Sequence, residues 1–153
     1  LRVHGKGKTK YDIDFIGLNS RLDTIQAAIL LAKLEDFEWE FKKRNELADN
    51  YNNFFKKYIE IPYIPEGSQS VWAQYTLKHK DRDIIQNQLN DIGIPTMVYY
   101  PVPMHLQKAY KEFYRGKLIN SEKLSKEVFS IPMYPDMLYE DQKYIIENII
   151  KLI

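Results

Sequence analysis

Two stretches of this sequence concentrate polar side chains that could bind a ligand. In the first, residues 17–23 (Gly-Leu-Asn-Ser-Arg-Leu-Asp), the amide of Asn19 and the guanidinium of Arg21 precede a long segment rich in apolar residues. If Ser20 is the N-cap of a helix, Asp23 falls at its third position and Arg21 in its first turn, where the helix dipole disfavours a cation. That placement suggests an anionic ligand for Arg21, and a solvated surface arginine explains it equally well.

The second stretch, residues 99–105 (Tyr-Tyr-Pro-Val-Pro-Met-His), combines two phenols and an imidazole in a loop with two prolines. The prolines lower the entropic cost of ordering the loop, which suits the edge of a binding site. The alternative is that Tyr99 and Tyr100 are core and rim aromatics and that His105 only caps a helix. From the residues alone, both stretches are candidate ligand loops without an assigned reaction.

Composition excludes several classes of protein. Lys plus Arg is 22 and Asp plus Glu is 21, so a net charge of +1 provides no general field for nucleic acid or anionic membrane. The absence of cysteine excludes a disulfide scaffold and a thiolate site, and it fits a reducing compartment. The three histidines, His4, His79 and His105, lack metal-ligand spacing. The longest apolar run, residues 27–32, is far below the ~20 residues that span a bilayer. We therefore expect a cytoplasmic protein with no metal, nucleic-acid or membrane partner.

The N-terminal third is predicted to be a loop followed by helix. Residues 1–18 show no apolar periodicity and are expected to be irregular. Residues 22–58 carry apolar side chains at three-and-four spacing without Gly or Pro, which predicts one helix of about 35 residues. We expect a kink near residues 35–40, and two shorter helices are the alternative. Because so long a helix overhangs any core this chain can build, part of its apolar face should pack on other protein or on a second subunit.

The remainder alternates short strands and helices. The strands are expected at residues 71–78, with Tyr75 and Leu77 on the buried face, at 94–100 and at 131–133. The helices are expected at 81–92 (with Ile84, Ile85, Leu89 and Ile92 inward, ended by Gly93), around 106–113, from 120–121 to about 129, and at 140–152. The predicted fold class is α/β, a long N-terminal helix followed by a small two-layer α/β domain.

Several motifs in order along the chain carry a family resemblance. The first is Gly17-x-Asn-Ser-Arg-Leu-Asp-x-x-Gln-Ala-Ala, and it is followed by residues 72–75 (Trp-Ala-Gln-Tyr), 93–110 and 130–133 (Ser-Ile-Pro-Met). Together they resemble the DegT-type nucleotide-sugar aminotransferases, which use pyridoxal phosphate (PLP). The resemblance covers nearly the whole chain. It implies a fold type I enzyme that forms a homodimer with active sites shared across the interface.

The resemblance also implies roles for single residues. Asn19 would reach into the neighbouring subunit's site and bind the cofactor phosphate, as suits an amide near a helix N-terminus. Arg21 would contact an anionic part of the nucleotide sugar, and Tyr100 and His105 would border the sugar pocket. The implied reaction is amino transfer from glutamate to a keto-sugar nucleotide in surface-polysaccharide or glycan biosynthesis. The local sequences at residues 19–23 and 94–101 are most similar to those of enzymes that aminate the 3-keto position of a UDP-hexuronic acid.

One departure from the family concerns the lysine that binds PLP covalently. In the family it lies well upstream of the Gly-x-Asn-x-Arg motif, and Lys6, Lys8 and Lys10 do not match its motif. The resemblance therefore implies the C-terminal part of an aminotransferase: 1–18 as a remnant of the large PLP-binding domain, 19–60 as the connecting helix and 61–153 as the small domain. Two alternatives stay open, a PLP-dependent sugar dehydratase in which histidine replaces the lysine, and a non-catalytic helical dimerisation module.

We expect the 153-residue chain by itself to show no transaminase activity, because the resemblance places the PLP-binding lysine before Leu1. The measurement is amino transfer from glutamate to a keto-sugar nucleotide by the purified chain with added PLP. Turnover, or an absorbance band of lysine-bound PLP that borohydride abolishes, would contradict this expectation.

Overall fold

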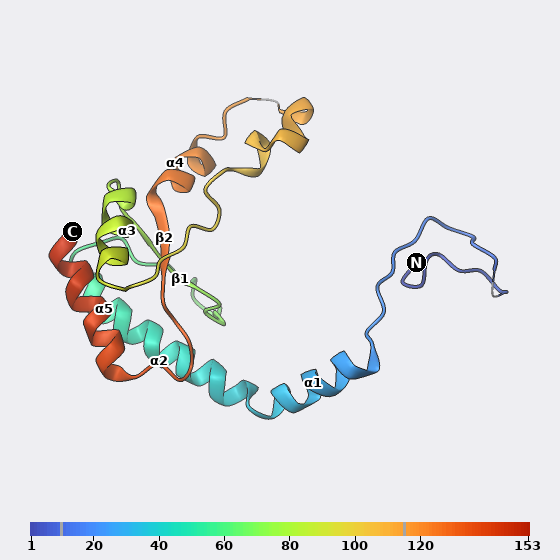
Figure 1. The fold of residues 1–153 in the computed structure, drawn as a ribbon, viewed down its shortest axis with the longest axis horizontal. Coiled ribbons are helices and arrows are strands. Elements are labelled where there is room, and N and C mark those ends of the chain that lie inside the picture. Colours follow the sequence, from blue (N-terminus) through green and yellow to red (C-terminus); the bar gives the residue numbers. More distant parts are fainter. Residues whose placement is uncertain (10, 115) are drawn as a thin grey trace. The chain divides into compact units, whose positions relative to one another are not determined.

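The structure, a computed structural model, describes residues 1–9, 11–114 and 116–153. The described residues form two compact units, Leu1–Glu38 and Trp39–Ile153. Figure 1 follows the chain by colour from the first unit, in blue, through the second. Among the described residues, no helix combines the length and the apolar character needed to cross a membrane.

In the first unit, the N-terminal segment pairs with itself before the first helix begins. Val3 and Asn19 form an antiparallel bridge, and the Ser20 N–H donates to the Arg2 carbonyl at 2.9 Å. This pairing keeps residues 19 and 20 extended, so helix α1 (Thr24–Glu35) starts with Asp23 as its N-cap. The predicted N-cap at Ser20 is therefore wrong. Arg21 precedes the helix instead of lying in its first turn.

The single long helix expected over residues 22–58 is interrupted. Helix α1 ends at Glu35, and helix α2 spans Phe37–Phe55. Asp36 lies between them with φ −96° and ψ −2°, and its N–H donates to the Leu34 carbonyl instead of one turn back. Aspartate is a weak helix former because its side chain competes for backbone hydrogen bonds. The break falls in the interval expected to kink.

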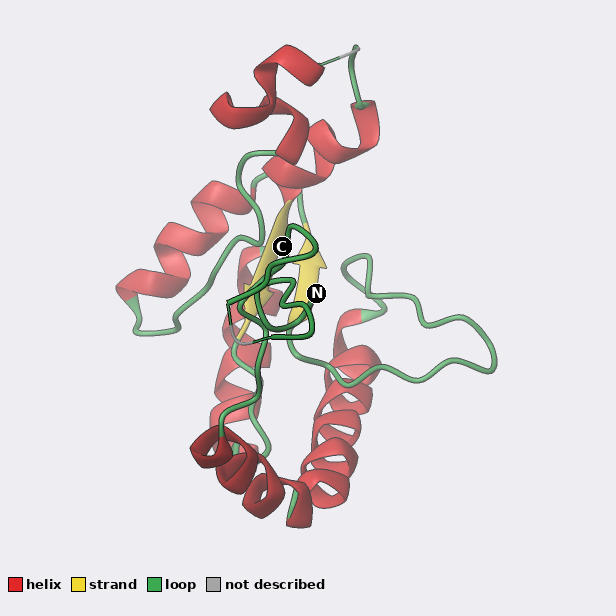
Figure 2. Cartoon of the chain, turned by 90° about the vertical axis from the view of Figure 1, so that its right-hand side faces the viewer, coloured by secondary structure: helices red, strands yellow, loops and turns green. Residues whose placement is uncertain are grey.

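The second unit is built around two antiparallel strands. Strand β1 (Tyr75–Lys78) pairs with β2 (Val128–Ile131), with Tyr75 opposite Ile131, and Figure 2 shows them side by side in yellow. Single bridges extend the pair, Glu60 with Lys78 on one edge and Met97 with Ser130 on the other. The strand expected at 94–100 is thus reduced to one bridge.

Two local constraints shorten or shift the expected strands. The strand predicted from residue 71 begins only at Tyr75, because Trp72 adopts a positive φ of 47° and buries its indole in the core. The strand predicted at 131–133 is displaced to Val128–Ile131. Pro132 follows it directly, and proline cannot donate to a further ladder bond. Tyr75 and Leu77 are buried as expected.

Three helices and two 3₁₀ turns complete the second unit. They are α3 (Arg82–Asp91), η1 (Met104–Leu106), η2 (Lys108–Phe113), α4 (Ile119–Glu127) and α5 (Tyr139–Leu152). Helix α3 ends before Gly93, which takes φ +80° at the expected C-cap position. Ile85 and Leu89 are buried as predicted, whereas Ile84 and Ile92 are exposed.

The hydrophobic core joins α2, the strands, α3 and α5. Its largest fully buried side chains include Tyr51, Phe55, Tyr75 and Phe129. The Tyr51 ring lies 4.9 Å from that of Tyr75 and 5.6 Å from that of Phe55, measured between centroids. Helix α3 packs against both α5 and β2. The predicted class, a helical arm with a small two-layer α/β domain, is confirmed.

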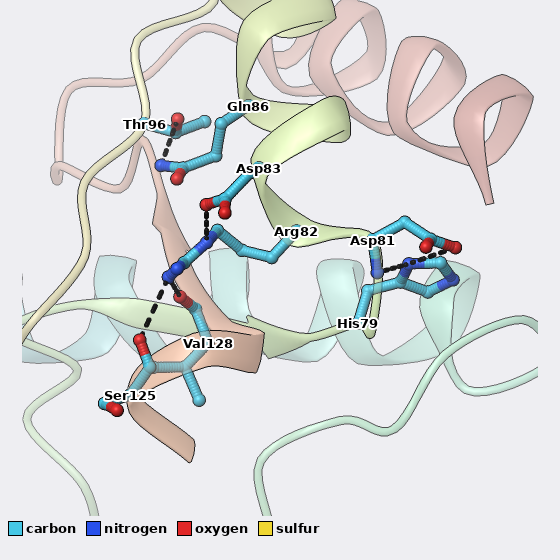
Figure 3. Close-up of polar contacts among 8 residues, drawn as sticks. All are labelled: His79, Asp81, Arg82, Asp83, Gln86, Thr96, Ser125 and Val128. Carbon is cyan, nitrogen blue, oxygen red and sulfur yellow. Dashed lines mark hydrogen bonds and ion pairs between the residues drawn. The ribbon is translucent and has the colours of Figure 1, made fainter. Parts of the chain in front are cut away.

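Arg82 links α3 to the junction of α4 and β2. The residue is only 7% exposed, and its Nη1 donates to the carbonyls of Val128 at 2.9 Å and Ser125 at 3.4 Å. Nε donates to the Asp83 carboxylate at the surface. Figure 3 shows the guanidinium extending from α3 toward these two carbonyls. A buried guanidinium satisfied in this way fixes the position of the chain where α4 becomes β2.

We expect Arg82→Met to lower the free energy of unfolding by about 2 kcal/mol, because two buried carbonyls lose their charged donor. Urea denaturation followed by circular dichroism measures this change. Lys80→Met, at an exposed neighbouring cation, is the matched control and should stay within about 0.5 kcal/mol of the unsubstituted chain. Equal effects of the two substitutions would refute a structural role for Arg82.

Candidate functional site

An open pocket of about 790 Å³ lies between the loop at 99–107, the two 3₁₀ turns and α4. Its size falls in the range of small-molecule sites. Most of its lining is aromatic or apolar, and the polar contributors include His105, Gln107 and Ser121. The structure thus brings together Tyr100 and His105, two residues singled out in the sequence.

His105 is held firmly at this pocket. Its Nε2 lies 3.2 Å from Oε1 of Glu122, and its ring stacks on Tyr114 with centroids 5.8 Å apart. The His105 side chain is only 14% exposed, whereas Tyr100 is largely exposed. Sequence reasoning missed Glu122 and Tyr114. A glutamate in the first turn of a predicted helix is a signal for capping, and it gives no hint of a histidine 17 residues earlier.

Glu122 makes two hydrogen bonds through one oxygen. Its Oε1 accepts from the Leu118 N–H at 3.0 Å in addition to facing His105. Both hydrogen bonds hold the pKa of Glu122 below its usual value, and the one with His105 has the larger effect. Glu122 is therefore an ionised carboxylate at neutral pH, and it accepts hydrogen bonds without donating.

Helix α3 holds two parts of the pocket in place through hydrogen bonds. Ser125 and Val128 line the pocket, and Arg82 binds their carbonyls (Figure 3). From the same helix, Gln86 donates to the Thr96 hydroxyl at 2.8 Å, just before the loop begins. Helix α3 thus supports both sides of the site without lining it.

Asn19 and Arg21 belong to the other compact unit, Leu1–Glu38. Both are exposed, and neither side chain makes a hydrogen bond or ion pair with another described residue. Their backbone is well defined by close packing: a Cβ on Gly17 would collide with the backbone of His4 and Gly5. The glycine of the Gly-x-Asn-x-Arg motif therefore permits the close approach that places Asn19.

The described residues include the possible metal ligands and two of the three N-terminal lysines. No group of three His, Cys, Asp or Glu residues there could hold a metal ion. Lys6 and Lys8 are exposed, unlike the desolvated lysines that form Schiff bases. Lys10 lies outside the described residues.

The helices followed by a small domain with a two-stranded sheet match the C-terminal part of a fold type I aminotransferase. The model of the DegT/DnrJ/EryC1/StrS aminotransferase family matches residues 1–150, and the chain belongs to this family. The family resemblance stated from the sequence is confirmed.

Three relatives illustrate the similarity. The chain is 38% identical to the pleiotropic regulatory protein of Geobacillus stearothermophilus over 97% of this chain and 41% of the relative. It is 41% identical to the UDP-2-acetamido-2-deoxy-3-oxo-D-glucuronate aminotransferase of Pseudomonas aeruginosa over 86% of this chain and 36% of that relative. The chain is also 45% identical to a DegT DnrJ EryC1 StrS aminotransferase from Brucella abortus whose crystal structure it matches with a TM-score of 0.90. This match covers 97% of this chain and 40% of that one. The chain therefore spans about two fifths of the length of these relatives.

The family depends on PLP, and the residues present fit one end of that cofactor. Asn19 offers an exposed amide that has no partner among the described residues, and an amide N–H is a suitable donor to a phosphate oxygen. Neither described N-terminal lysine is buried. The exposed amide of Asn19 is thus chemically suited to a phosphate group.

We expect Glu122→Gln to reduce the loss of stability on acidification. A carboxyl with a lowered pKa contributes stability that is complete above the unfolded value of 4.5 and is lost as pH falls through the folded value. The free energy of unfolding should therefore fall less in the variant than in the unsubstituted chain between pH 5 and about pH 3. Urea denaturation at a series of pH values measures both slopes, and parallel slopes would contradict the lowered pKa.

Proposed function

We propose that this chain is the C-terminal part of a PLP-dependent aminotransferase that transfers the amino group of glutamate to a keto-sugar nucleotide. The observation that carries the proposal is the pocket that combines Tyr100 and a firmly held His105 in a chain of this family. A site with apolar walls and a few fixed polar groups suits a sugar, whose hydroxyls need oriented partners. When bound, PLP supplies the electron sink for amino transfer.

In this proposal each site residue has a binding role. Asn19 donates its amide N–H to the cofactor phosphate. Arg21 pairs with a carboxylate or the diphosphate of the nucleotide sugar, for which a guanidinium offers paired donors. Tyr100 and His105 border the sugar ring. The free side chains of Asn19 and Arg21 support these roles, since neither is committed to a partner within the described residues.

The apolar surface of α1 supports a homodimer with shared active sites. No residue of α1 is buried within the described chain, and Ile25, Leu31 and Leu34 are 76%, 67% and 61% exposed. At about 100° per residue, these side chains and Leu30 point in several directions around the helix. A helix with apolar side chains over most of its circumference exposes more apolar surface than one partner face covers, so it is normally enclosed by protein. We propose that a second copy and the large domain enclose it, with residues 1–18 belonging to that domain, 19–60 connecting, and 61–153 forming the small domain.

The substrate is proposed to be a 3-keto UDP-hexuronic acid, used in surface-polysaccharide biosynthesis. The named activity of the relative from P. aeruginosa supports this choice, as does an uncommitted arginine able to bind a sugar carboxylate. The lack of cysteine agrees with a cytoplasmic enzyme. Separate assays of the full-length enzyme with 3-keto uronate and 4-keto-6-deoxy sugar nucleotides test the choice, and faster amination of the latter would overturn it.

Subunit complementation tests the sharing of the site. In the full-length enzyme, Asn19→Ala and a variant without the PLP-binding lysine should each be inactive or strongly impaired. If Asn19 acts in the partner's site, one site of each mixed dimer is intact. Equal mixing after unfolding and refolding should then restore about a quarter of the unsubstituted activity, because half of the dimers are mixed.

The control for complementation places both substitutions in one chain. Mixing this double variant with Asn19→Ala leaves no dimer with an intact site, so it should restore nothing. Failure of the first mixture to regain activity, with dimers verified by sedimentation, would show that Asn19 serves the site of its own subunit.

A further inference from the structure

The imidazole of His105 is fixed by two independent contacts. Its ring lies nearly parallel to that of Tyr114, with 14° between the planes, and its Nε2 is 3.2 Å from Glu122 Oε1. The ring stack sets the plane of the imidazole, and the hydrogen bond sets its rotation within that plane. The second ring nitrogen, Nδ1, therefore has a defined direction.

The Glu122 carboxylate is fixed as well. Its Oε1 accepts the Leu118 N–H at the start of α4, where the helix dipole favours a negative charge. Because the lowered pKa keeps this carboxylate ionised at neutral pH, it accepts hydrogen bonds only. The proton between the two residues therefore lies on Nε2 of the imidazole.

Nδ1 of His105 is accessible and has no partner among the described residues. It makes no hydrogen bond to a described residue, yet none of the buried side-chain nitrogens and oxygens described lacks a partner. Nδ1 is therefore accessible, and His105 lines the pocket. In a neutral imidazole protonated at Nε2, Nδ1 carries a lone pair that accepts a hydrogen bond.

We propose that Glu122 is a positioning residue: it holds His105 in the Nε2-protonated form, so that Nδ1 accepts a hydrogen bond from a hydroxyl group of the sugar in the pocket. The identity of the ligand rests on the proposed function, whereas the control of His105 by Glu122 rests on the contacts of these two residues and the charge of the carboxylate. Tyr114 supports the same arrangement by fixing the ring plane.

The first experiment measures the state of His105 in the 153-residue chain. Nitrogen-15 NMR of labelled histidine at pH 8 distinguishes protonated from unprotonated ring nitrogens, and removing His4 and His79 in turn assigns the signals. The unsubstituted chain should show His105 as a single form protonated at Nε2. In Glu122→Met, the two nitrogen shifts should move toward each other, because the other neutral form becomes populated.

The controls separate this effect from general damage to the fold. Glu127→Met removes another carboxylate from α4, one that faces Lys123, and should leave the His105 signals unchanged. Glu122→Gln keeps an oxygen that can accept from both Nε2 and the Leu118 N–H, so it should restore most of the original shifts. Unchanged His105 shifts in Glu122→Met, with the chain folded, would overturn the proposal.

The second experiment uses the full-length enzyme and separates its two half-reactions. Glu122→Met should raise KM for the sugar nucleotide about tenfold, the effect of losing one oriented hydrogen bond, and leave the reaction with glutamate unchanged. Glu122→Gln should recover most of the affinity for the sugar nucleotide. Equal impairment of both half-reactions would instead mean a merely structural role and would overturn the positioning role.

The two experiments keep the two proposals distinguishable. If the full-length enzyme aminates no keto-sugar nucleotide, the sugar is overturned as the ligand, and the nitrogen shifts still decide whether Glu122 controls His105. If the shifts respond as expected and the KM for the sugar nucleotide does not, the hydrogen bond from Nδ1 to the sugar is overturned.

Discussion

The buried Tyr51 is the residue on which the architecture of the second unit depends. Its ring packs against those of Phe55 and Tyr75, and its hydroxyl donates to the Pro132 carbonyl at 2.8 Å. Burial raises the pKa of this phenol well above its usual value, so it stays a neutral donor. One side chain thereby joins α2, β1 and the segment after β2. Breaking this contact would leave a buried carbonyl without its donor and a cavity in the core.

A short series of contacts connects this core to the pocket and fixes the geometry of the pocket. The core fixes β2, and Arg82 fixes the start of β2 and the end of α4. Helix α4 presents Glu122, and Glu122 holds His105 at the edge of the loop. The contacts of Arg82 and of Glu122 are directional hydrogen bonds, which explains how a loop with largely exposed aromatics holds one imidazole in a set orientation.

Local sequence patterns predicted much of the fold, and long-range contacts explain most of the misses. The periodicity around Ile85 and Leu89 and the C-cap at Gly93 identified α3 because both signals are local. Ser20 was wrongly predicted as an N-cap because its pairing with Arg2 is invisible to helix rules. Of the residues that line the candidate pocket, Tyr100 and His105 were singled out from the sequence through a proline-stiffened loop and a family resemblance. Glu122 was missed because nothing in its neighbourhood along the chain reveals His105 as its partner.

The residues that line the pocket differ from those that hold it in place, and this difference affects how the pocket can evolve. Arg82 and Gln86 hold the wall and the start of the loop from α3, and neither lines the pocket. Exposed lining side chains such as Met104 and Phe113 can therefore be exchanged at little cost to folding. Such an arrangement lets one scaffold diversify its ligand preferences by drift in a single loop, which suits a family whose members are named for several different sugars.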